Sequence, residues 1–547
     1  MRRLLRTILD RLFTSLASLS VLLMAAALLI ILGPILWRGA GAVVFQGTVE
    51  FRELHLREFG HGDSEAVAAE VKAAEQARQP MYDLLNRFAR GIDTEDGQSQ
   101  ARHVYRELKT QLGHRVEDGR LTEAREDALR DAGKEIRNAL IDAYRADTND
   151  EARRHLAAVL NHPRRGAFDG TVGQTLFDLA QTYQEVVQTV DLGRRAEYAA
   201  EYQAVDEIIT KLFGPAPGEE PAADLAQFRY GATRLDRARK LVGDLRWKET
   251  WVPVGPGQPL QKKLVDREEI FAGTALAGLF DLVERDLPRT LRPRQTIYWR
   301  YFTDGGPPGN LFGGVGRPLA GTLLLALFAM LFSVPIGIVT AGYLVECTRE
   351  GRLIRFIRMC INTLAGVPSI VFGLFGLAFF VLWFLPKFGL PKDISILAGS
   401  LTLGVLVLPI IIRASEEAIR AVPGSYKEAS LALGAGAFRT FVVVTLPAAL
   451  PGILTGIILA VSRAAGETAP ILFTAAVAYR PDIPDSIFSG GTEALSYGAY
   501  VFATADNLAS IAPHNQYGMT MTLILLVLLL NVTAILIRSR MSKKLRG

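Results

Sequence analysis

The stretch from Arg413 to Gly452, RASEEAIRAVPGSYKEASLALGAGAFRTFVVVTLPAALPG, is a polar segment between two long apolar runs. It predicts a short amphipathic helix over Tyr426–Leu433, with Ala, Ser and Leu on one face. Gly434 can take a positive φ and so end that helix, and a second helix then enters the following apolar run. A surface helix of this kind fits a groove on a partner protein, although an ordinary interhelical loop is the simpler alternative.

The apolar runs along the chain are long enough to cross a membrane. A bilayer core of about 30 Å requires roughly 20 consecutive apolar residues in a helix. The segments that meet this length are Ser15–Trp37, Leu319–Val345, Gly366–Leu385, Ile394–Ile412, Leu446–Val477 and Met519–Ile537. The fifth is long enough to hold a broken or tilted helix. The sequence therefore predicts six transmembrane helices.

Basic residues in the short flanks set the orientation, because cytoplasmic loops carry an excess of Lys and Arg. Four flanks are rich in them: Arg2, Arg3, Arg6 and Arg11; Arg349, Arg352, Arg355 and Arg358; Arg413, Arg420, Lys427 and Arg439; and Arg538, Arg540, Lys543, Lys544 and Arg546. The alternate short loops hold only Lys387, Lys392 and Arg480. With six spans the four basic flanks share one side, so both termini are predicted to be cytoplasmic.

Composition averages conceal two unlike halves of the chain. The 547 residues carry a net charge of +5, with 49% hydrophobic and 21% charged residues, which excludes a disordered or collagen-like chain. Residues 51–300 are charge-dense and lack a span, whereas the apolar runs follow from about Pro318. We expect an anchor and cytoplasmic N-terminus at 1–37, an extracytoplasmic insertion at 38–316 and a transmembrane domain at 317–547.

The sequence of the insertion predicts helices. Apolar residues recur at three- and four-residue steps, as in Leu129, Ala132, Ile136, Leu140 and Tyr144, and again in Leu176, Leu179, Tyr183, Val186 and Val190. Linkers rich in Pro and Gly interrupt the pattern at 214–221 and 252–259. The fold class is therefore an all-α membrane protein with a mainly helical extracytoplasmic domain between helices 1 and 2.

Two features bear on how the insertion is held. Cys347 and Cys360 are the only cysteines and both lie near the loop between spans two and three, so no disulfide can staple the insertion. The first apolar run could be a cleaved signal peptide, with Ala40 and Ala42 at a small-residue site, but it is longer than a usual signal core of about 7–15 residues. We expect an uncleaved anchor.

The loop at 414–447 resembles the EAA loop of ABC-importer permeases, E-A-A-x3-G-x9-I-x-L-P, with Ser430 and Val444 as departures. The resemblance assigns ATPase coupling to these residues: Glu428, Ala429, Ser430, Gly434, Leu446 and Pro447. NTLAGVPSIVFGLFGLA (Asn362–Ala378) and AVSRAAGETAPILFTAA (Ala460–Ala476) resemble phosphate transport permeases of the PstA type. The long insertion departs from the short form of that family and resembles the extension of its longer bacterial members.

That resemblance, which covers about Gly313 to Arg540, implies a bacterial inner-membrane permease for ATP-driven import of inorganic phosphate. Its implied partners are a PstC-type permease, two ATP-binding subunits and an extracytoplasmic phosphate-binding protein. ATP and Mg²⁺ would be bound by the ATPase subunits, so we expect no cofactor in this chain and no nucleic-acid partner. The role of the insertion is left open.

The sequence contains no catalytic motif. No G-x-x-x-x-G-K-[ST] string occurs, and the only Gly-Lys pair, Gly133-Lys134, is followed by Glu. The histidines avoid the predicted spans and show no ligand spacing, so we expect no metal site. We therefore expect a subunit that is not an enzyme, with no catalytic residues.

Charges inside the fifth apolar run are the best candidates for a substrate pathway. Arg463 and Glu467 are four residues apart and share one helix face, and an ionisable group in mid-bilayer costs at least about 2.5–3.5 kcal/mol. Either Arg463 meets a phosphate dianion, with Glu467 holding its geometry and Thr468 beside them, or the pair is a buried structural ion pair.

Other polar residues lie near the ends of spans three and four. Arg413, Glu416 and Glu417 could gate the exit or contact the ATPase, or could be ordinary boundary charges. Asn362, Pro368 and Ser369 precede an apolar run, where Pro368 could kink a helix along the path or simply start it.

Three other functions remain open from the residues alone. The first is a permease of the same architecture for another oxyanion or solute. The second is a membrane sensor or scaffold that uses the external domain, although no cytoplasmic signalling domain accompanies it. The third is an autonomous secondary transporter, which would be expected to show two matching halves with broken helices.

Overall fold

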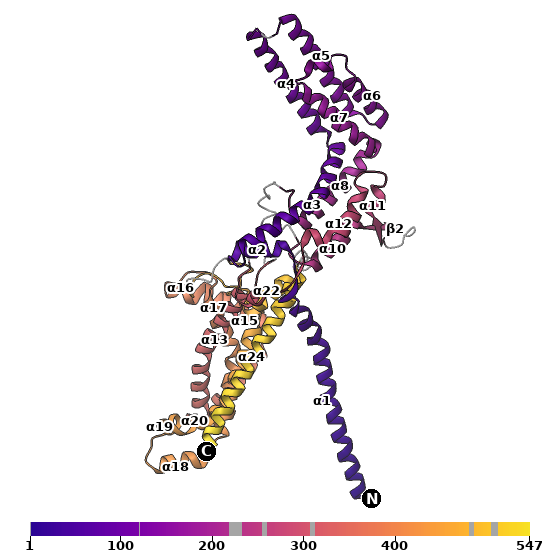
Figure 1. The fold of residues 1–547 in the computed structure, drawn as a ribbon. Coiled ribbons are helices and arrows are strands. Elements are labelled where there is room, and N and C mark those ends of the chain that lie inside the picture. The colour runs from indigo at the N-terminus through magenta and orange to yellow at the C-terminus, as the bar shows by residue number, and fades with distance from the viewer. Residues whose placement is uncertain are drawn as a thin grey trace. The chain divides into compact units, whose positions relative to one another are not determined.

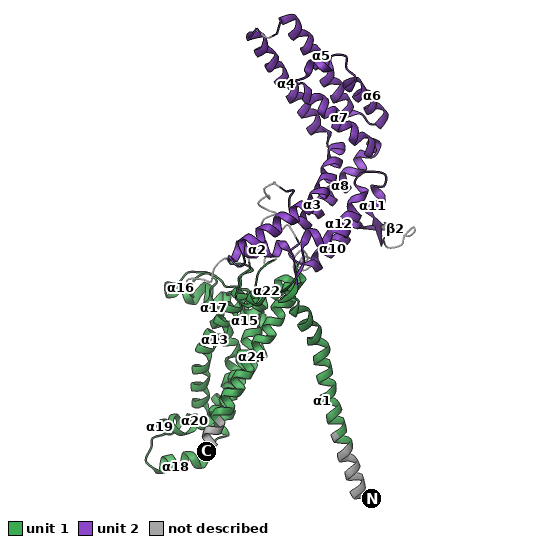
Figure 2. Cartoon of the chain, in the orientation of Figure 1, with its two compact units in different colours: residues 1–45, 295–547 green, residues 46–294 purple. Residues whose placement is uncertain are grey.

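The computed structural model describes residues 2–119, 121–217, 232–253, 260–306, 312–349, 351–480, 486–504 and 512–546. The chain divides into two units, one formed by Met1–Phe45 with Gln295–Gly547 and the other by Gln46–Arg294 (Figure 2). We call them unit 1 and unit 2. Parts of the two expected linkers, residues 218–221 and 254–259, lie outside the described residues.

Unit 1 is built from long apolar helices and short connecting elements (Figure 1). The helices are α1 (Arg2–Ala40), α13 (Gly316–Gly342), α14 (Arg352–Leu364), α15 (Ser369–Gly376), α16 (Leu385–Lys387), α17 (Ile396–Arg420), α18 (Gly424–Ala432), α19 (Ala437–Thr440), α20 (Leu446–Gly466), α21 (Ala469–Leu472), α22 (Leu495–Thr504) and α24 (Pro513–Arg546). π-Helical turns follow or precede them at Tyr343–Cys347, Leu377–Phe384 and Phe441–Thr445, and a 3₁₀ turn spans Trp299–Phe302.

Six of these helical stretches are long and apolar enough to cross a membrane, which confirms the predicted spans. They are Ser15–Ala40, Gly316–Cys347, Ser369–Lys387, Ile396–Arg420, Ala437–Gly466 and Pro513–Met541. The fifth run, predicted to hold a broken or tilted helix, is broken: α20 stops at Gly466, before the predicted end of the run at Val477. Glu467 adopts an extended backbone there, with φ −78° and ψ 130°, and Pro470 follows within the short α21.

Small residues let the central helices of unit 1 approach closely. In the most apolar stretch of α17, 67% of the residues are buried, whereas none are buried in that of α1. A β-carbon at Gly337 of α13 would come within 2.6 Å of the Ile411 side chain, and one at Gly456 of α20 within 2.2 Å of the Ala414 β-carbon. Close backbone contact through small residues is the usual basis of helix packing in membranes, so α17 forms the centre of the bundle.

The described residues between α21 and α22, 473–480 and 486–494, are irregular in backbone but hydrogen-bonded. Thr492 N donates to Ala475 O at 2.8 Å, and Ser395 N donates to Thr474 O at 2.9 Å. Non-helical backbone at membrane depth is tolerated where it is buried in protein or lines a cavity. This segment therefore interrupts the bundle directly after the Arg463–Glu467 pair.

Unit 2 is mainly helical, as predicted. Its helices are α2 (Val49–Phe59), α3 (Ser64–Ile92), α4 (Thr94–Glu117), α5 (Glu123–Arg145), α6 (Asn149–Leu160), α7 (Gln174–Thr189), α8 (Arg195–Phe213), α10 (Leu235–Arg246), α11 (Arg267–Ile270) and α12 (Ala277–Leu291), with 3₁₀ turns at Arg165–Phe168 and Leu192–Arg194. Side chains cap several of these helices; Asp63, for example, accepts from Glu65 N at 3.0 Å at the start of α3.

The core of unit 2 confirms the predicted helical stripes. Leu129, Ala132, Ile136, Leu140 and Tyr144 are all buried along α5. The sequence did not anticipate the strands: β2 (Trp247–Pro253) pairs antiparallel with β3 (Leu260–Asp266), and β1 (Val44–Gly47) pairs with β4 (Arg294–Ile297). An aromatic cluster is also buried in this core. The ring centroid of Phe271 lies 5.4 Å from that of Phe88 and 5.8 Å from that of Tyr198.

Candidate functional site

Arg463 and Glu467 form an ion pair at the end of α20. Arg463 Nε lies 3.1 Å from Glu467 Oε1, and the two side chains are 36% and 20% exposed. The four-residue spacing does bring the side chains together, but Glu467 is the residue at which the helix ends. The pair therefore lies where the helix breaks, and Arg463 is also placed to interact with the C-terminal end of the helix dipole.

Neighbouring elements surround this helix end. Ser496 Oγ, from α22, donates to the Glu467 carbonyl at 3.2 Å. Thr468 is half-buried and precedes α21. A β-carbon at Gly373 of α15 would come within 2.7 Å of the Ala469 carbonyl, so α15 packs directly against α21. The helix that begins at Ser369 is thus in contact with the segment that follows Glu467.

α18 carries three of the six predicted coupling residues and has no buried residue. Glu428 and Ala429 are exposed and Ser430 is half-buried. Ser430 Oγ and the Thr440 hydroxyl are hydrogen-bonded at 2.9 Å, and Lys427 forms an ion pair with Glu346, at the end of the α13 span. α18 is therefore open to a partner on one side and tied to neighbouring elements on the other.

The turn after α18 takes the predicted form. Gly434 has φ +84°, its N–H donates to Leu431 O at 2.9 Å, and Ala435 N donates to Ser430 O at 3.2 Å. Leu446 and Pro447 begin α20, which continues directly from the π-helical turn Phe441–Thr445. Beside this turn, Leu433 is 89% exposed.

A cavity of about 240 Å³ brings together four of the six residues predicted as a gate or interface; Pro368 and Ser369 do not line it. It is lined by Arg358, Ile361, Asn362, Arg413, Glu416, Glu417 and Arg420. Arg413 Nε donates to Asn362 Oδ1 at 2.7 Å, and Arg358 Nε lies 3.0 Å from Glu416 Oε1. Arg358 and Arg420 were not among the predicted site residues; the four-residue spacing of Glu416 and Arg420 was the available signal for the second.

Pro368 occupies the N-cap position of α15, with φ −57° and ψ 139°, and Ser369 is the first residue of that helix. Two alternatives were open for Pro368, a kink within a helix or the start of one. In the structure Pro368 starts α15.

Glu493 is a further buried carboxylate that sequence reasoning missed. It is 4% exposed, and its Oε1 accepts from Arg480 N at 2.8 Å. Arg317 NH1 donates to the Arg480 carbonyl at 2.5 Å. Burial raises the pKa of Glu493, opposed by the Arg480 N–H and by the charge of Arg317. Through these hydrogen bonds, Arg317 at the start of α13 contacts the irregular segment that contains Arg480 and Glu493.

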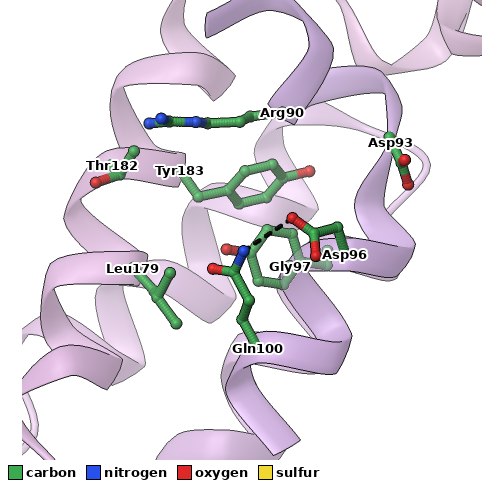
Figure 3. A pocket seen from close by; sticks show the side chains of 9 residues that line it. Arg90, Asp93, Asp96, Gly97, Gln100, Leu179, Thr182 and Tyr183 are labelled. Carbon is green, nitrogen blue, oxygen red and sulfur yellow. Dashed lines mark hydrogen bonds between the residues drawn. The ribbon is translucent and has the colours of Figure 1, made fainter. Parts of the chain in front are cut away.

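Unit 2 has a cavity of its own, of about 230 Å³, between α3, α4, α5 and α7 (Figure 3). Tyr144 and Tyr183 form one wall with ring centroids 4.3 Å apart, and burial raises the pKa of the Tyr144 phenol. Asp96 accepts from Gln100 Nε2 at 2.8 Å. Two carboxylates, Asp93 and Asp96, line it beside a single arginine, so the cavity does not favour an anion.

His55 and His61, also in unit 2, have ring centroids 5.2 Å apart and both line a cavity of about 230 Å³. The sequence spacing did not point to this pair.

The chain is similar to known membrane permeases. A family model described as "Binding-protein-dependent transport system inner membrane component" matches residues 333–547. The phosphate transport system permease protein PstA 1 of Mycobacterium tuberculosis (strain CDC 1551 / Oshkosh) is 39% identical over 241 residues, which are 44% of this chain and 76% of that protein. PstA of Yersinia pestis is 34% identical over 264 residues, 48% of this chain and 85% of that protein.

Among solved structures, an inward-facing conformation of the MetNI methionine ABC transporter aligns with a TM-score of 0.30 and 22% identity, covering 42% of this chain and 94% of that one.

Proposed function

Because the chain belongs to the family of binding-protein-dependent transport system inner membrane components, the non-catalytic permease subunits of ABC importers, we propose that the solute it carries is inorganic phosphate. The observation that carries the proposal is its 39% identity to a PstA phosphate permease across 76% of that protein. The Arg463–Glu467 pair supports it, since a half-exposed guanidinium suits a doubly charged oxyanion.

In this proposal Arg463 meets phosphate within the membrane, and Glu467 and Thr468 shape the site around it. Glu467 fixes the guanidinium and competes with the anion for it, so the anion binds weakly enough to leave. The anion would reach this site at the end of α20, because the last turn of the helix lies next to irregular backbone. Pro368 and Ser369 begin α15, which packs against α21 beside this segment, whereas Asn362 accepts from Arg413 in the cavity between α14 and α17.

α18 is the proposed contact with an ATPase subunit. Its exposed face would sit in a groove of that subunit, and its movement would pass to α13 through Lys427–Glu346 and to α20 through Ser430–Thr440. ATP binding would favour one arrangement of the spans and hydrolysis the other. Arg413, Glu416 and Glu417 would act as a gate or ATPase interface nearby.

The proposed assembly contains a PstC-type permease, two ATPases that bind ATP and Mg²⁺, and a phosphate-binding protein on the outer face. In this proposal both termini lie in the cytoplasm and residues 38–316 lie outside it, as the excess of Lys and Arg in the short flanks predicts. A same-fold permease for another oxyanion is the alternative that the experiment below must exclude. A sensor or scaffold role would require that the complex carry no solute.

The test is uptake by the complete complex in reconstituted vesicles with ATP inside and the binding protein outside. We expect uptake of labelled phosphate that depends on the binding protein and resists excess sulfate and molybdate. Efficient competition by sulfate or molybdate would reassign the substrate. No uptake of any of the three anions by an intact complex would remove the phosphate proposal.

A further inference from the structure

The cavity between α14 and α17 is built on two helices that are packed together. An apolar cluster that includes Ile354 of α14 and Ile412 of α17 joins them. α17 leads within a few residues into the exposed helix α18. A site on two regular helices holds its side chains in more constant positions than a site on loops.

The cavity wall contains more basic than acidic side chains, and its arginines differ in their partners. Three arginines and two glutamates line it. Glu416 Oε1 is shared by two arginines, with Arg358 Nε at 3.0 Å and an Arg420 guanidinium nitrogen at 2.9 Å. Arg413 instead donates to the neutral amide of Asn362. In the described part of the chain, no carboxylate lies within ion-pair distance of Arg413.

We propose that this cavity binds a phosphate-type oxyanion, held by Arg413 together with Arg358 and Arg420. Guanidinium groups match the geometry of phosphate oxygens and form charge-assisted hydrogen bonds with them. The cavity volume of about 240 Å³ leaves room for a tetrahedral anion with water. The site differs from the Arg463–Glu467 pair, which is on another helix, α20.

Two sources can supply this chemistry at the end of a span on the predicted cytoplasmic side. One is free inorganic phosphate that accumulates on that side, a source that rests on the proposed function. The other is the headgroup of an anionic lipid, since the arginines lie close to the predicted membrane boundary.

Glu416 is the internal competitor of the anion. Its carboxylate occupies the positions on Arg358 and Arg420 that a bound anion would use. Replacing Glu416 with the neutral Gln removes the negative charge that Arg358 and Arg420 share and should strengthen binding, whereas loss of Arg413 should weaken it. Bound anion would loosen the Arg358–Glu416 link between α14 and α17, next to α18.

The experiment uses the full chain, purified in detergent, with the background substitution Arg463→Gln so that the proposed pathway residue contributes no binding. Inorganic phosphate is titrated without ATP or binding protein, and its binding is measured by calorimetry. A parallel arm compares thermal unfolding in nanodiscs of phosphatidylcholine alone and with phosphatidylglycerol. Arg413→Gln and Glu416→Gln are compared with Arg355→Gln, which removes an exposed arginine of α14 outside the cavity wall.

We expect saturable phosphate binding that Arg413→Gln weakens at least tenfold, that Glu416→Gln strengthens several-fold and that Arg355→Gln leaves unchanged. The same pattern in the phosphatidylglycerol arm alone would assign the anion to a lipid headgroup. Binding in neither arm, or equal effects of Arg413→Gln and Arg355→Gln, overturns the site. Uptake by the complex is a separate measurement, so failure of phosphate transport would leave this result interpretable.

Discussion

Arg463 and Glu467 meet at the last turn of α20, and this position bears on how the pair acts. A charged side chain in the last turn of a helix lies beside the irregular backbone that follows it. Arg463 is 36% exposed in this position. At the scale of single residues, the proposed function depends on a few charges where helices end.

Arg463→Gln should lower phosphate uptake at least tenfold while the complex still assembles, because the neutral amide offers neither charge nor a guanidinium fork to the anion. Arg463→Lys should retain part of the uptake, since it keeps the charge but loses bidentate geometry. The measurements are vesicle uptake and co-purification of the subunits. Unchanged uptake in Arg463→Gln would leave the pair a purely structural role.

Glu493 gives a prediction about pH. Its pKa is raised by burial, so the folded chain holds this proton more tightly than the unfolded one. Stability from this group is then present below the unfolded pKa of about 4.3 and is lost as pH rises through the folded pKa. Glu493→Gln stays neutral and keeps an acceptor for Arg480 N. It should raise the thermal midpoint by a few degrees at pH 8.

The gain from Glu493→Gln should shrink toward pH 5, where the carboxyl of the parent chain is closer to its protonated form. Thermal unfolding of the detergent-purified chain at the two pH values measures this. A lower midpoint for the variant at pH 8 would mean that the attraction of Arg317 outweighs the cost of burial.

At the scale of elements, α18 and the turn after it are the proposed site of coupling to the ATPase. The helix has no buried residue, so its own stability is slight and its position depends on the links at either end. The Gly434 turn sets the direction in which the chain returns to α20. Coupling should therefore be more sensitive to backbone geometry at this turn than to side chains around it.

Gly434→Ala should reduce both uptake and transport-stimulated ATP hydrolysis. A β-carbon at φ +84° brings strain of about 1–2 kcal/mol, which should shift α18 away from its docking position. Gly434→Asn should recover part of the loss, because Asn tolerates this conformation better. Gly436→Ala is the matched control: Gly436 is two residues away with φ −73° and has open space around it. Equal activity of the two alanine variants would contradict the coupling role.

At the scale of the whole molecule, the chain consists of two units with separate cores. The ends of unit 2 are tied to each other, since an Arg52 guanidinium donates to the Arg292 carbonyl at 2.9 Å and Glu70 pairs with both Arg52 and Arg294 at 2.7 Å. An insertion whose ends are adjacent can be added to a fold without separating the elements on either side.

We therefore expect residues 46–294, produced alone, to fold as a helical protein with cooperative unfolding measured by circular dichroism. Phe271→Ala should lower its stability by about 3–5 kcal/mol, because that ring is fully buried against Phe88, Tyr198 and Phe280. A fragment without a cooperative transition would show that unit 2 depends on the rest of the chain.

The sequence by itself determined the helical spans, the buried stripe of α5, the positive φ of Gly434 and the pairing of Arg463 with Glu467. These features depend on residues close in sequence: apolar run length, three- and four-residue periodicity, and the freedom of glycine. Tertiary structure decided the rest. α20 ends at Gly466. Arg358 lines one cavity with Arg413 and Glu416, which are 55 or more residues away in the sequence. Glu493 is buried beside Arg480. Such contacts join helices whose relative register follows from packing between small residues, and no local pattern encodes that packing.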